Sequence, residues 1–301
     1  MKLNILGCYA ATPRQFTNPT SQVLEVKGHL FLIDCGEGTQ VQLRKYKIKF
    51  ARIKHIFISH LHGDHFYGLI GLISTFRLLG READLHIYGP KGLKDAMFFL
   101  LKIGDSSVNY KLIFHELTSE KSELIFEDDK LTVHTIPLNH RVYTNGFLFK
   151  EKIGDRKLDI NKATEYDIET CYYQKIKQGF DVPNKKGEMV KNEWLTQAPN
   201  PAKSYAFCSD TAYHESIVPL IKGVSLLYHE STFLKDKENL CDKTKHSTAE
   251  QAATIAKKAA VKQLLLGHYS TRYTNLNLFK EEAETVFKPV WLADDGKSFE
   301  F

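Results

Sequence analysis

The run HLHGDH at residues 60–65 carries the side chains best suited to chemistry in this sequence. They are His60, His62, Asp64 and His65. Imidazole nitrogens and carboxylate oxygens are common protein ligands of zinc. Alternate residues of an extended segment point to the same side, so His60 and His62 can face one ion. Asp64 and His65 follow a glycine, which frees the backbone to turn them toward a second ion.

Three further ligand candidates occur later in the chain, each just beyond an apolar segment. They are His140, Asp210 and His268. A carboxylate has two oxygens, so we expect two zinc ions with Asp210 bridging them. Their other ligands would be His60, His62 and His140 for one ion, and Asp64, His65 and His268 for the other. Two ions about 3.5–4 Å apart can generate hydroxide from a shared water and direct it at an electrophile.

The segments that carry these residues have the pattern of strands alternating with helices. Apolar strand-like runs at 55–59, 131–138, 205–209 and 261–266 each end shortly before a candidate ligand. The second half of the chain thus repeats the order of strand followed by ligand. This pattern predicts an α/β sandwich, in which loops at strand ends hold the reactive side chains.

Local signals also predict particular turns and helices. Apolar residues at helical spacing predict a helix over 69–79, and a second helix is expected over about 165–177. Residues 34–39 have the glycine pattern of a turn. Ser247 and Glu250 have the spacing of a capping box and predict the start of a helix there.

Composition narrows the class of protein. The net charge of +5 over 301 residues permits nucleic acid as a partner without requiring it. Five scattered cysteines with no CxxC pair indicate a reducing compartment. The first residues, MKLNILG, lack the features of a signal peptide, and no apolar run reaches membrane-spanning length. We therefore expect a cytoplasmic protein.

Residues 150–200 differ from the rest of the chain. They are rich in lysine and are interrupted by several glycines and prolines. We expect one domain over 1–301 with 150–200 inserted into it, either as a solvated insertion or as an arm that contacts a phosphate backbone.

Together these motifs resemble the metallo-β-lactamase superfamily and, more narrowly, the ribonuclease Z family of tRNA 3′-processing endonucleases. HLHGDH with the later His, Asp and His marks the superfamily. The narrower resemblance rests on DCGEGTQ (34–40), SHLHGDH (59–65), HEST (229–232), HST (246–248) and GHYSTRY (267–273).

The resemblance implies a fold and a reaction. The fold would be a metallo-β-lactamase αββα sandwich of two mixed sheets flanked by helices, with 150–200 as a protruding substrate-binding arm. The protein would be a dizinc endoribonuclease that removes 3′ trailers from precursor tRNA by metal-hydroxide attack on phosphorus. The products would be a tRNA 3′-hydroxyl and a trailer 5′-phosphate.

The resemblance also implies residue roles and partners. His246 would donate a proton to the leaving oxygen, Glu230 would orient His246, and Asp64 would join them in the catalytic group. The precursor tRNA would be bound by a homodimer, with manganese as the alternative to zinc. Arg272 is expected to contact phosphate or to form a salt bridge, and His229 to support the site by packing.

Two alternatives belong to other functional classes. The same dizinc centre could hydrolyse small phosphodiesters, lactones or thioesters, or the chain could be an RNA-binding paralogue without activity. The basic 150–200 segment favours RNA over small substrates. The presence of all seven candidate ligands and both proton-transfer residues favours an enzyme.

Overall fold

The computed structural model describes residues 1–12 and 14–301 and divides them into two compact units. The first unit comprises Met1–Glu127, Thr132–Phe149 and Lys203–Phe301. The second comprises Asp128–Leu131 and Lys150–Ala202. Each unit has apolar side chains of its own to bury, so each is described by itself.

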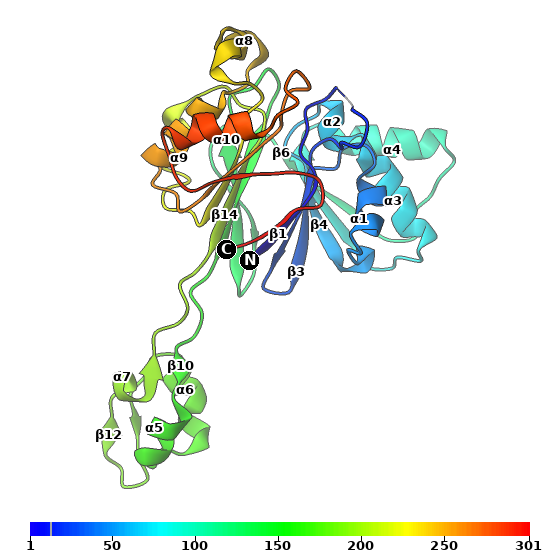
Figure 1. Ribbon diagram of the computed structural model, residues 1–301. Helices are drawn as coiled ribbons and strands as arrows, with labels where there is room; N and C mark the ends of the chain where they lie inside the picture. Colours follow the sequence, from blue (N-terminus) through cyan, green and yellow to red (C-terminus); the bar gives the residue numbers. More distant parts are fainter. Residues whose placement is uncertain (13) are drawn as a thin grey trace. The chain divides into compact units, whose positions relative to one another are not determined.

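The first unit contains two seven-stranded sheets (Figure 1). The first has the order β18-β1-β2-β3-β4-β5-β6, antiparallel from β18 to β3 and parallel from β3 to β6. Its strands are β1 (Lys2–Gly7), β2 (Ser21–Val26), β3 (His29–Ile33), β4 (Ile53–Phe57), β5 (Leu85–Pro90), β6 (Leu112–Leu117) and β18 (Ser298–Glu300).

The second sheet has the order β17-β16-β15-β14-β9-β8-β7. Strands β14 to β17 are parallel to one another, and β7 pairs antiparallel with β8. The bounds are β7 (Leu124–Glu127), β8 (Leu131–Pro137), β9 (Asn145–Glu151), β14 (Ser204–Cys208), β15 (Leu226–Glu230), β16 (Leu264–Gly267) and β17 (Val290–Leu292).

Aromatic side chains join the facing surfaces of the two sheets. Alternate residues of a strand point to the same face, so Phe31 and Phe57 project from the first sheet toward the second. The ring centroids of Phe31 and Phe149 are 5.4 Å apart, and those of Phe57 and Phe147 are 5.3 Å apart. All four side chains are fully buried. The interior of the sandwich is therefore a packed aromatic layer.

Helices cover the outer faces of both sheets (Figure 1). On the first sheet α1, α3 and α4 bury apolar side chains such as Leu43, Phe76 and Met97 against the strands. On the second sheet α9 and α10 lie over the strands. The helices of this unit are α1 (Thr39–Lys45), α2 (Gly63–Phe66), α3 (Gly68–Leu78), α4 (Leu93–Ile103), α8 (Glu238–Thr244), α9 (Ala249–Lys258) and α10 (Asn277–Glu284), with 3-10 turns η1 (Phe50–Arg52), η3 (Glu215–Ile217) and η4 (Lys235–Lys237). The predicted αββα sandwich of two mixed sheets is confirmed.

The predicted capping box was wrong by one residue. The N-cap of α9 is Thr248, whose side chain accepts a hydrogen bond from the Gln251 backbone, and the Gln251 side chain accepts one from the Thr248 N–H. Ser247 instead donates its hydroxyl hydrogen bond to the Thr211 carbonyl. Both residues can cap a helix, so the competing long-range bond decided between them.

The second unit packs short elements around a small apolar cluster of its own. The cluster is formed by Ala163, Ile168, Ile176, Val182, Val190 and Leu195. The elements are β10 (Lys157–Leu158), α5 (Ile160–Glu165), η2 (Thr170–Tyr172), α6 (Tyr173–Lys177), β11 (Val182–Pro183), β12 (Met189–Val190), α7 (Asn192–Leu195) and β13 (Thr196–Gln197). The single helix expected over 165–177 is wrong, because Asp167 adopts a left-handed backbone (φ 55°) that interrupts it.

Two further expectations concern the cysteines and membrane spans. All five cysteines are free thiols, four of them buried. Among the described residues, no helix has the length and apolar character needed to cross a membrane.

Four histidines form a row across the inner face of the first sheet. They are His29, His55, His86 and His115 on neighbouring strands. The rings of His55 and His86 are stacked at 4.9 Å, and His86 Nδ1 lies 3.0 Å from His115 Nε2. Burial, together with the adjacent imidazoles and Lys54, lowers the pKa of His55 to about 3. Burial also lowers the pKa of His115, so His55 and His115 are neutral at neutral pH.

The lowered pKa of His55 predicts that the stability of the fold decreases in acid. A histidine with a depressed native pKa binds fewer protons when folded, so its contribution to stability is lost as the pH falls from about 6.5 toward 3. The urea midpoint of the wild type should therefore fall more between pH 7 and pH 4 than that of His55→Phe, which keeps a ring in the row. Parallel pH dependences for the two proteins would contradict this origin.

Candidate metal centre

The candidate ligands gather at the carboxyl ends of strands from both sheets of the first unit. His60 and His62 follow β4, and the short helix α2 carries Asp64 and His65. From the second sheet, His140 follows β8, Asp210 follows β14 and His268 follows β16. Parallel strands bring their carboxyl ends to one edge, so residues distant in sequence converge there. The structure brings all seven side chains together.

The first group is formed by His60, His62, His140 and one oxygen of Asp210. His62 Nδ1 lies 3.0 Å from His60 Nε2 and 3.2 Å from His140 Nε2. Asp210 Oδ2 lies 3.6 Å from His60 Nε2 and 3.8 Å from His140 Nε2. Four potential ligand atoms thus surround one point.

The second group is formed by Asp64, His65 and His268 with the other oxygen of Asp210. Asp64 Oδ2 lies 3.4 Å from His65 Nε2 and 3.5 Å from His268 Nε2. Asp210 Oδ1 lies 3.2 Å from each of these two nitrogens. Asp210 therefore directs Oδ2 to the first group and Oδ1 to the second, which is the arrangement of a bridging carboxylate.

The geometry of both groups suits a metal ion better than internal hydrogen bonding. Ligands of tetrahedral zinc at about 2.0–2.1 Å are about 3.3 Å from one another, close to the separations found here. His65 Nε2 and His268 Nε2 are buried and have no hydrogen-bond partner among the described residues. Buried polar atoms usually have a partner, and a cation in the second group would provide one for both nitrogens.

The electrostatics of the cluster favour cation binding. Burial lowers the pKa of His60, His62 and His140, so these imidazoles are neutral and their lone pairs are free for a metal. Burial alone would raise the pKa of Asp210, but the surrounding histidines hold it well below its usual range. Burial likewise opposes charge on His65, yet the carboxylates around it raise the pKa of that imidazole. The centre is thus a buried anionic environment.

Asp34 and Ser59 orient His65 and His60 through contacts with the Nδ1 atoms of their rings. Asp34 Oδ2 lies 2.7 Å from His65 Nδ1 and accepts a hydrogen bond from Ser59 Oγ at 2.9 Å. Ser59 Oγ in turn lies 3.0 Å from His60 Nδ1. Such contacts fix the tautomer and the direction of a ligand. Sequence reasoning treated residues 34–39 as a plain turn and missed this role, although Asp34 also follows an apolar strand.

The turn that carries Asp34 packs against α2, which carries Asp64 and His65, and against the start of α3. The Cys35 N–H donates to the His65 carbonyl at 2.7 Å, and the Gly68 N–H donates to the Cys35 carbonyl at 2.9 Å. A Cβ on Gly68 would lie 2.0 Å from the Gly36 carbonyl oxygen. Glycine is therefore required at position 68 for the turn and the helix to meet.

Glu230 connects His246 to the second group. Its Oε1 lies 2.8 Å from His246 Nδ1, and its Oε2 accepts hydrogen bonds from the N–H and hydroxyl of Thr232 at 2.9 and 2.7 Å. Thr232 Oγ1 lies 2.9 Å from His268 Nδ1. Burial alone would lower the pKa of His246, but the Glu230 carboxylate raises it to about 9. His246 is therefore protonated at neutral pH, with its position fixed through Nδ1.

Three of these residues have an unusual backbone. Asp34, Asp210 and His268 adopt left-handed conformations, with φ of 55°, 53° and 59°. Residues other than glycine rarely do so, because the Cβ atom is crowded there. This strain is offset by the fold around them and turns each side chain back toward the centre.

A cavity of about 420 Å³ opens over the two groups. Its wall includes Asp64, Asp210, His246 and His268 together with Arg141, Phe233 and Arg272. The Arg272 guanidinium donates a hydrogen bond to Ser270 Oγ at 3.2 Å and lies over the ring of Phe233 at 5.9 Å. Neither contact is with a carboxylate. His229, expected to support the site, is buried, and its Nδ1 lies 2.7 Å from the Glu230 carbonyl.

We predict that Asp34→Ala weakens metal binding without removing a ligand. His65 would lose the carboxylate that orients its ring, and loss of such partners typically costs 10–100-fold in metal affinity. Competition with a chromogenic zinc chelator measures this directly. The exposed Asp95→Ala is the matched control and should bind zinc as the wild type does. Equal affinity of the Asp34 variant would show that this hydrogen bond is dispensable.

Comparison with known proteins identifies relatives that extend along almost the whole chain. The family model described as "Anti-Pycsar protein Apyc1" matches residues 1–170. Ribonuclease Z of Bacteroides thetaiotaomicron is 46% identical over 295 residues, covering 98% of this chain and 93% of the relative. Ribonuclease Z of Bacteroides fragilis is 45% identical, covering 98% of this chain and 97% of the relative.

Solved structures give the same relationship. Human tRNase Z, short form, superposes with a TM-score of 0.72 at 28% identity, covering 100% of this chain and 99% of that one. The metallo-β-lactamase fold protein YhfI of Bacillus subtilis superposes with a TM-score of 0.69 at 18% identity, covering 99% of this chain and 98% of that one. The second likeness concerns the fold alone.

Proposed function

This chain belongs to the ribonuclease Z family, and on that premise we propose that it is the metal-dependent endoribonuclease that removes 3′ trailers from precursor tRNA. The observation that carries the proposal is the pair of ligand groups sharing Asp210, with the Glu230-bound His246 beside them. The Apyc1 family model ends at residue 170, whereas the ribonuclease Z relatives also cover the later residues of the site. These are Asp210, Glu230, His246 and His268.

We assign the seven candidate ligands to two zinc ions. The first ion would be held by His60, His62 and His140, the second by Asp64, His65 and His268, and Asp210 would bridge them. Zinc ions in these positions supply Lewis acidity, which activates water as a nucleophile and offsets negative charge on the phosphoryl oxygens. Manganese accepts the same imidazole and carboxylate ligands and is the alternative.

We assign His246 to protonate the leaving 3′ oxygen of the tRNA. Its Nδ1 contacts Glu230, so Nε2 is the nitrogen that can deliver a proton into the cavity. Glu230 is held by the Thr211 N–H at 3.0 Å as well as by Thr232, and therefore cannot swing away from the imidazole. A general acid of this kind makes departure of an alkoxide possible.

Asp64 belongs to both the ligand group and the catalytic group. Its contacts with His65 and His268 go through Oδ2. We assign Oδ1 to accept a hydrogen bond from the attacking water, which aligns that water with the phosphorus. The attack leaves a phosphate on the 5′ end of the trailer and a 3′-hydroxyl on the tRNA.

We assign residues 150–200, which make up most of the second unit, to binding the body of the tRNA. The second unit folds around its own apolar cluster, yet Phe180 is 59% exposed and Trp194 48% exposed. Lys191 lies over the ring of Trp194 at 5.8 Å. Lysines beside exposed aromatic rings suit contact with a phosphate backbone and with ribose or bases.

We further propose that the enzyme acts as a homodimer in the cytoplasm. The outer surfaces of α3 and α4 expose several large apolar side chains, a feature that often marks a protein interface. They include Leu78, Leu79, Phe98, Phe99, Leu100 and Ile103. Five free thiols and a tRNA substrate agree with a cytoplasmic location.

The hydrolysis of small phosphodiesters is the second candidate function. The Apyc1 family model matches residues 1–170, which contain the first five candidate ligands. This segment therefore resembles a second family as well as the ribonuclease Z relatives. Activity on precursor tRNA distinguishes the two functions.

The direct test is cleavage of a 3′-extended precursor tRNA, mapped at nucleotide resolution. We expect a cut immediately after the discriminator nucleotide, abolished by chelator and restored by zinc. Asp210→Ala should lose this activity, because each group would lose a ligand and the bridge between them. Hydrolysis of bis(p-nitrophenyl) phosphate without any cut in precursor tRNA would instead support the small-phosphodiester function.

The role of His246 predicts a difference between two substrates. His246→Ala should cleave precursor tRNA about 10²–10⁴-fold more slowly, the usual contribution of a general acid. It should lose much less on bis(p-nitrophenyl) phosphate, because nitrophenolate departs without protonation. Rates are compared at equal zinc content. Equal losses on both substrates would assign His246 to the metal centre rather than to proton donation.

A further inference from the structure

Residues 233–245 form an excursion between two parts of the site. They follow Thr232, include η4 and α8, and end immediately before His246. Most side chains from 235 to 243 are exposed, whereas that of Cys241 is buried. Apolar packing therefore fixes little of this segment, and its position depends on hydrogen bonds at its two ends.

The start of the segment pairs with the backbone beside His246. The Phe233 N–H donates to the Ser247 carbonyl at 3.2 Å, and the Ala249 N–H donates to the Phe233 carbonyl at 3.1 Å. The ring centroids of Phe233 and His246 are 6.3 Å apart. A shift at the start of the segment would therefore move the imidazole of His246.

The hydroxyl of Tyr273 holds this start in place. It donates to Asp236 Oδ1 at 2.7 Å and accepts a hydrogen bond from the Leu234 N–H at 3.2 Å. The ring of Tyr273 packs against Phe279 of α10, with centroids 5.1 Å apart. Burial, together with the hydrogen bond to Asp236, raises the pKa of Tyr273 to about 12, so the hydroxyl keeps its proton at neutral pH. One side chain thus fixes two residues of the segment on the covering helix α10.

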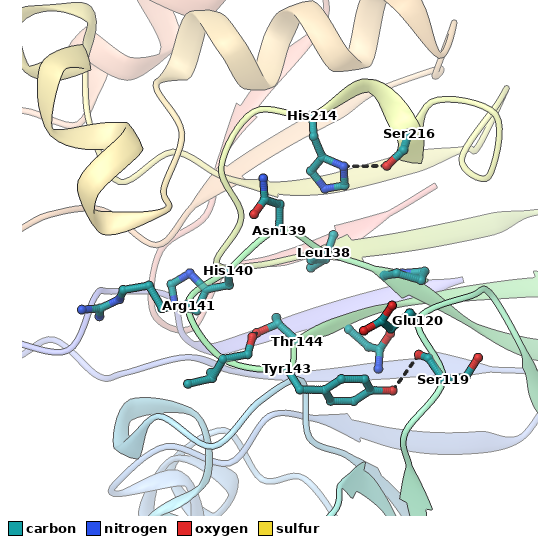
Figure 2. A pocket seen from close by; sticks show the side chains of 13 residues that line it. Ser119, Glu120, Leu138, Asn139, His140, Arg141, Tyr143, Thr144, His214 and Ser216 are labelled. Atoms are coloured by element: carbon teal, nitrogen blue, oxygen red, sulfur yellow. Dashed lines mark hydrogen bonds between the residues drawn. The ribbon is translucent and has the colours of Figure 1, made fainter.

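The end of the segment is tied to a candidate metal ligand. Lys245 has a left-handed backbone (φ 59°) at the C-cap of α8, and its N–H donates to the Cys241 carbonyl at 2.7 Å. The Lys245 carbonyl oxygen lies 3.0 Å from Nδ1 of His140, which lies in the wall of a neighbouring cavity of about 550 Å³ (Figure 2). The ring centroids of His140 and His246 are 5.2 Å apart. The segment is therefore held at both ends, with His246 directly after it.

We propose that Tyr273 is a positioning residue for proton donation, because its hydroxyl holds the segment that ends at His246. The inference rests on the proposed function, in which His246 Nε2 gives its proton to the leaving 3′ oxygen as the bond between that oxygen and phosphorus breaks. Glu230 sets the direction of the imidazole through Nδ1. Tyr273 sets the position of the backbone that carries the imidazole. Both matter, since a displacement of about 1 Å in an active site can slow a reaction about 10²-fold.

The test changes the leaving atom and keeps the rest of the substrate. Single-turnover cleavage is measured on precursor tRNA with either oxygen or sulfur as the bridging 3′ atom at the cut site. A thiolate departs without the proton that an alkoxide needs. We expect Tyr273→Phe to cleave the oxygen substrate about 10–100-fold more slowly than the wild type, and the sulfur substrate at the wild-type rate. Rates are compared at equal zinc content.

A second tyrosine supplies the matched control. The Tyr213 hydroxyl donates to Glu215 Oε1 at 2.7 Å, and Tyr213 does not line the cavity over the metal centre. Tyr213→Phe removes a hydroxyl bound to a carboxylate, as Tyr273→Phe does. It should match the wild type on both substrates.

Two variants of Asp236 test the same hydrogen bond from its other side. Asp236→Ala removes the acceptor of the Tyr273 hydroxyl and should slow only the oxygen substrate. Asp236→Asn keeps an oxygen acceptor and should restore most of the rate. Both variants lose the contact of Asp236 Oδ2 with Lys237 Nζ at 3.6 Å, so that contact cannot explain a difference between them. Asp236 is exposed, and neither change should disturb the fold.

The outcomes separate this inference from the proposed function. Equal slowing of Tyr273→Phe on the oxygen and sulfur substrates would overturn the inference, because the loss would then lie in the metal centre or in RNA binding. A wild-type rate on the oxygen substrate would overturn it as well. His246→Ala, measured in parallel, tests the proton donor itself. A wild type that does not cut precursor tRNA after the discriminator would refute the proposed function before any variant is compared.

Discussion

The active centre depends on one carboxylate, that of Asp210, which serves two groups of ligands at once. Oδ2 faces the imidazoles of His60 and His140, and Oδ1 lies 3.2 Å from both His65 and His268. Asp210 follows a strand of the second sheet, while residues 60–65 follow a strand of the first. A shift of about an ångström between the sheets would separate the two groups. The aromatic layer between the sheets is therefore what keeps the bridge in register.

The sequence allowed the ligand candidates to be predicted because each one follows an apolar strand, a signal that is local. The contribution of Asp34 was not predictable in this way, since it consists of a hydrogen bond to His65, 31 positions away. Thr232, which joins Glu230 to His268, is a similar case. The misplaced capping box has the same cause: Ser247 and Thr248 are locally equivalent, and the distant Thr211 carbonyl selects between them.

Glu230 joins two functions that are usually considered separately. One of its oxygens orients His246, and the other, through Thr232, positions the imidazole of His268. Because Glu230 is fully buried in this hydrogen-bond network, a displacement of His246 also affects Thr232 and His268, and the reverse holds. The proton donation proposed for His246 and the geometry of the second ligand group are therefore linked, and substitutions at Glu230, Thr232 and His246 should not have additive effects.

Four carboxylates, those of Asp34, Asp64, Asp210 and Glu230, are buried within this one edge of the fold. Negative charges so close together repel one another, and nearby positive charge, including that of bound metal cations, stabilises them. Cation binding to the folded chain alone adds its free energy to the stability of the fold. The amount of such an enzyme therefore depends on metal supply: when the metal is scarce, a larger fraction of the chains unfolds and is exposed to cellular proteases, so scarcity reduces the number of enzyme molecules as well as their activity.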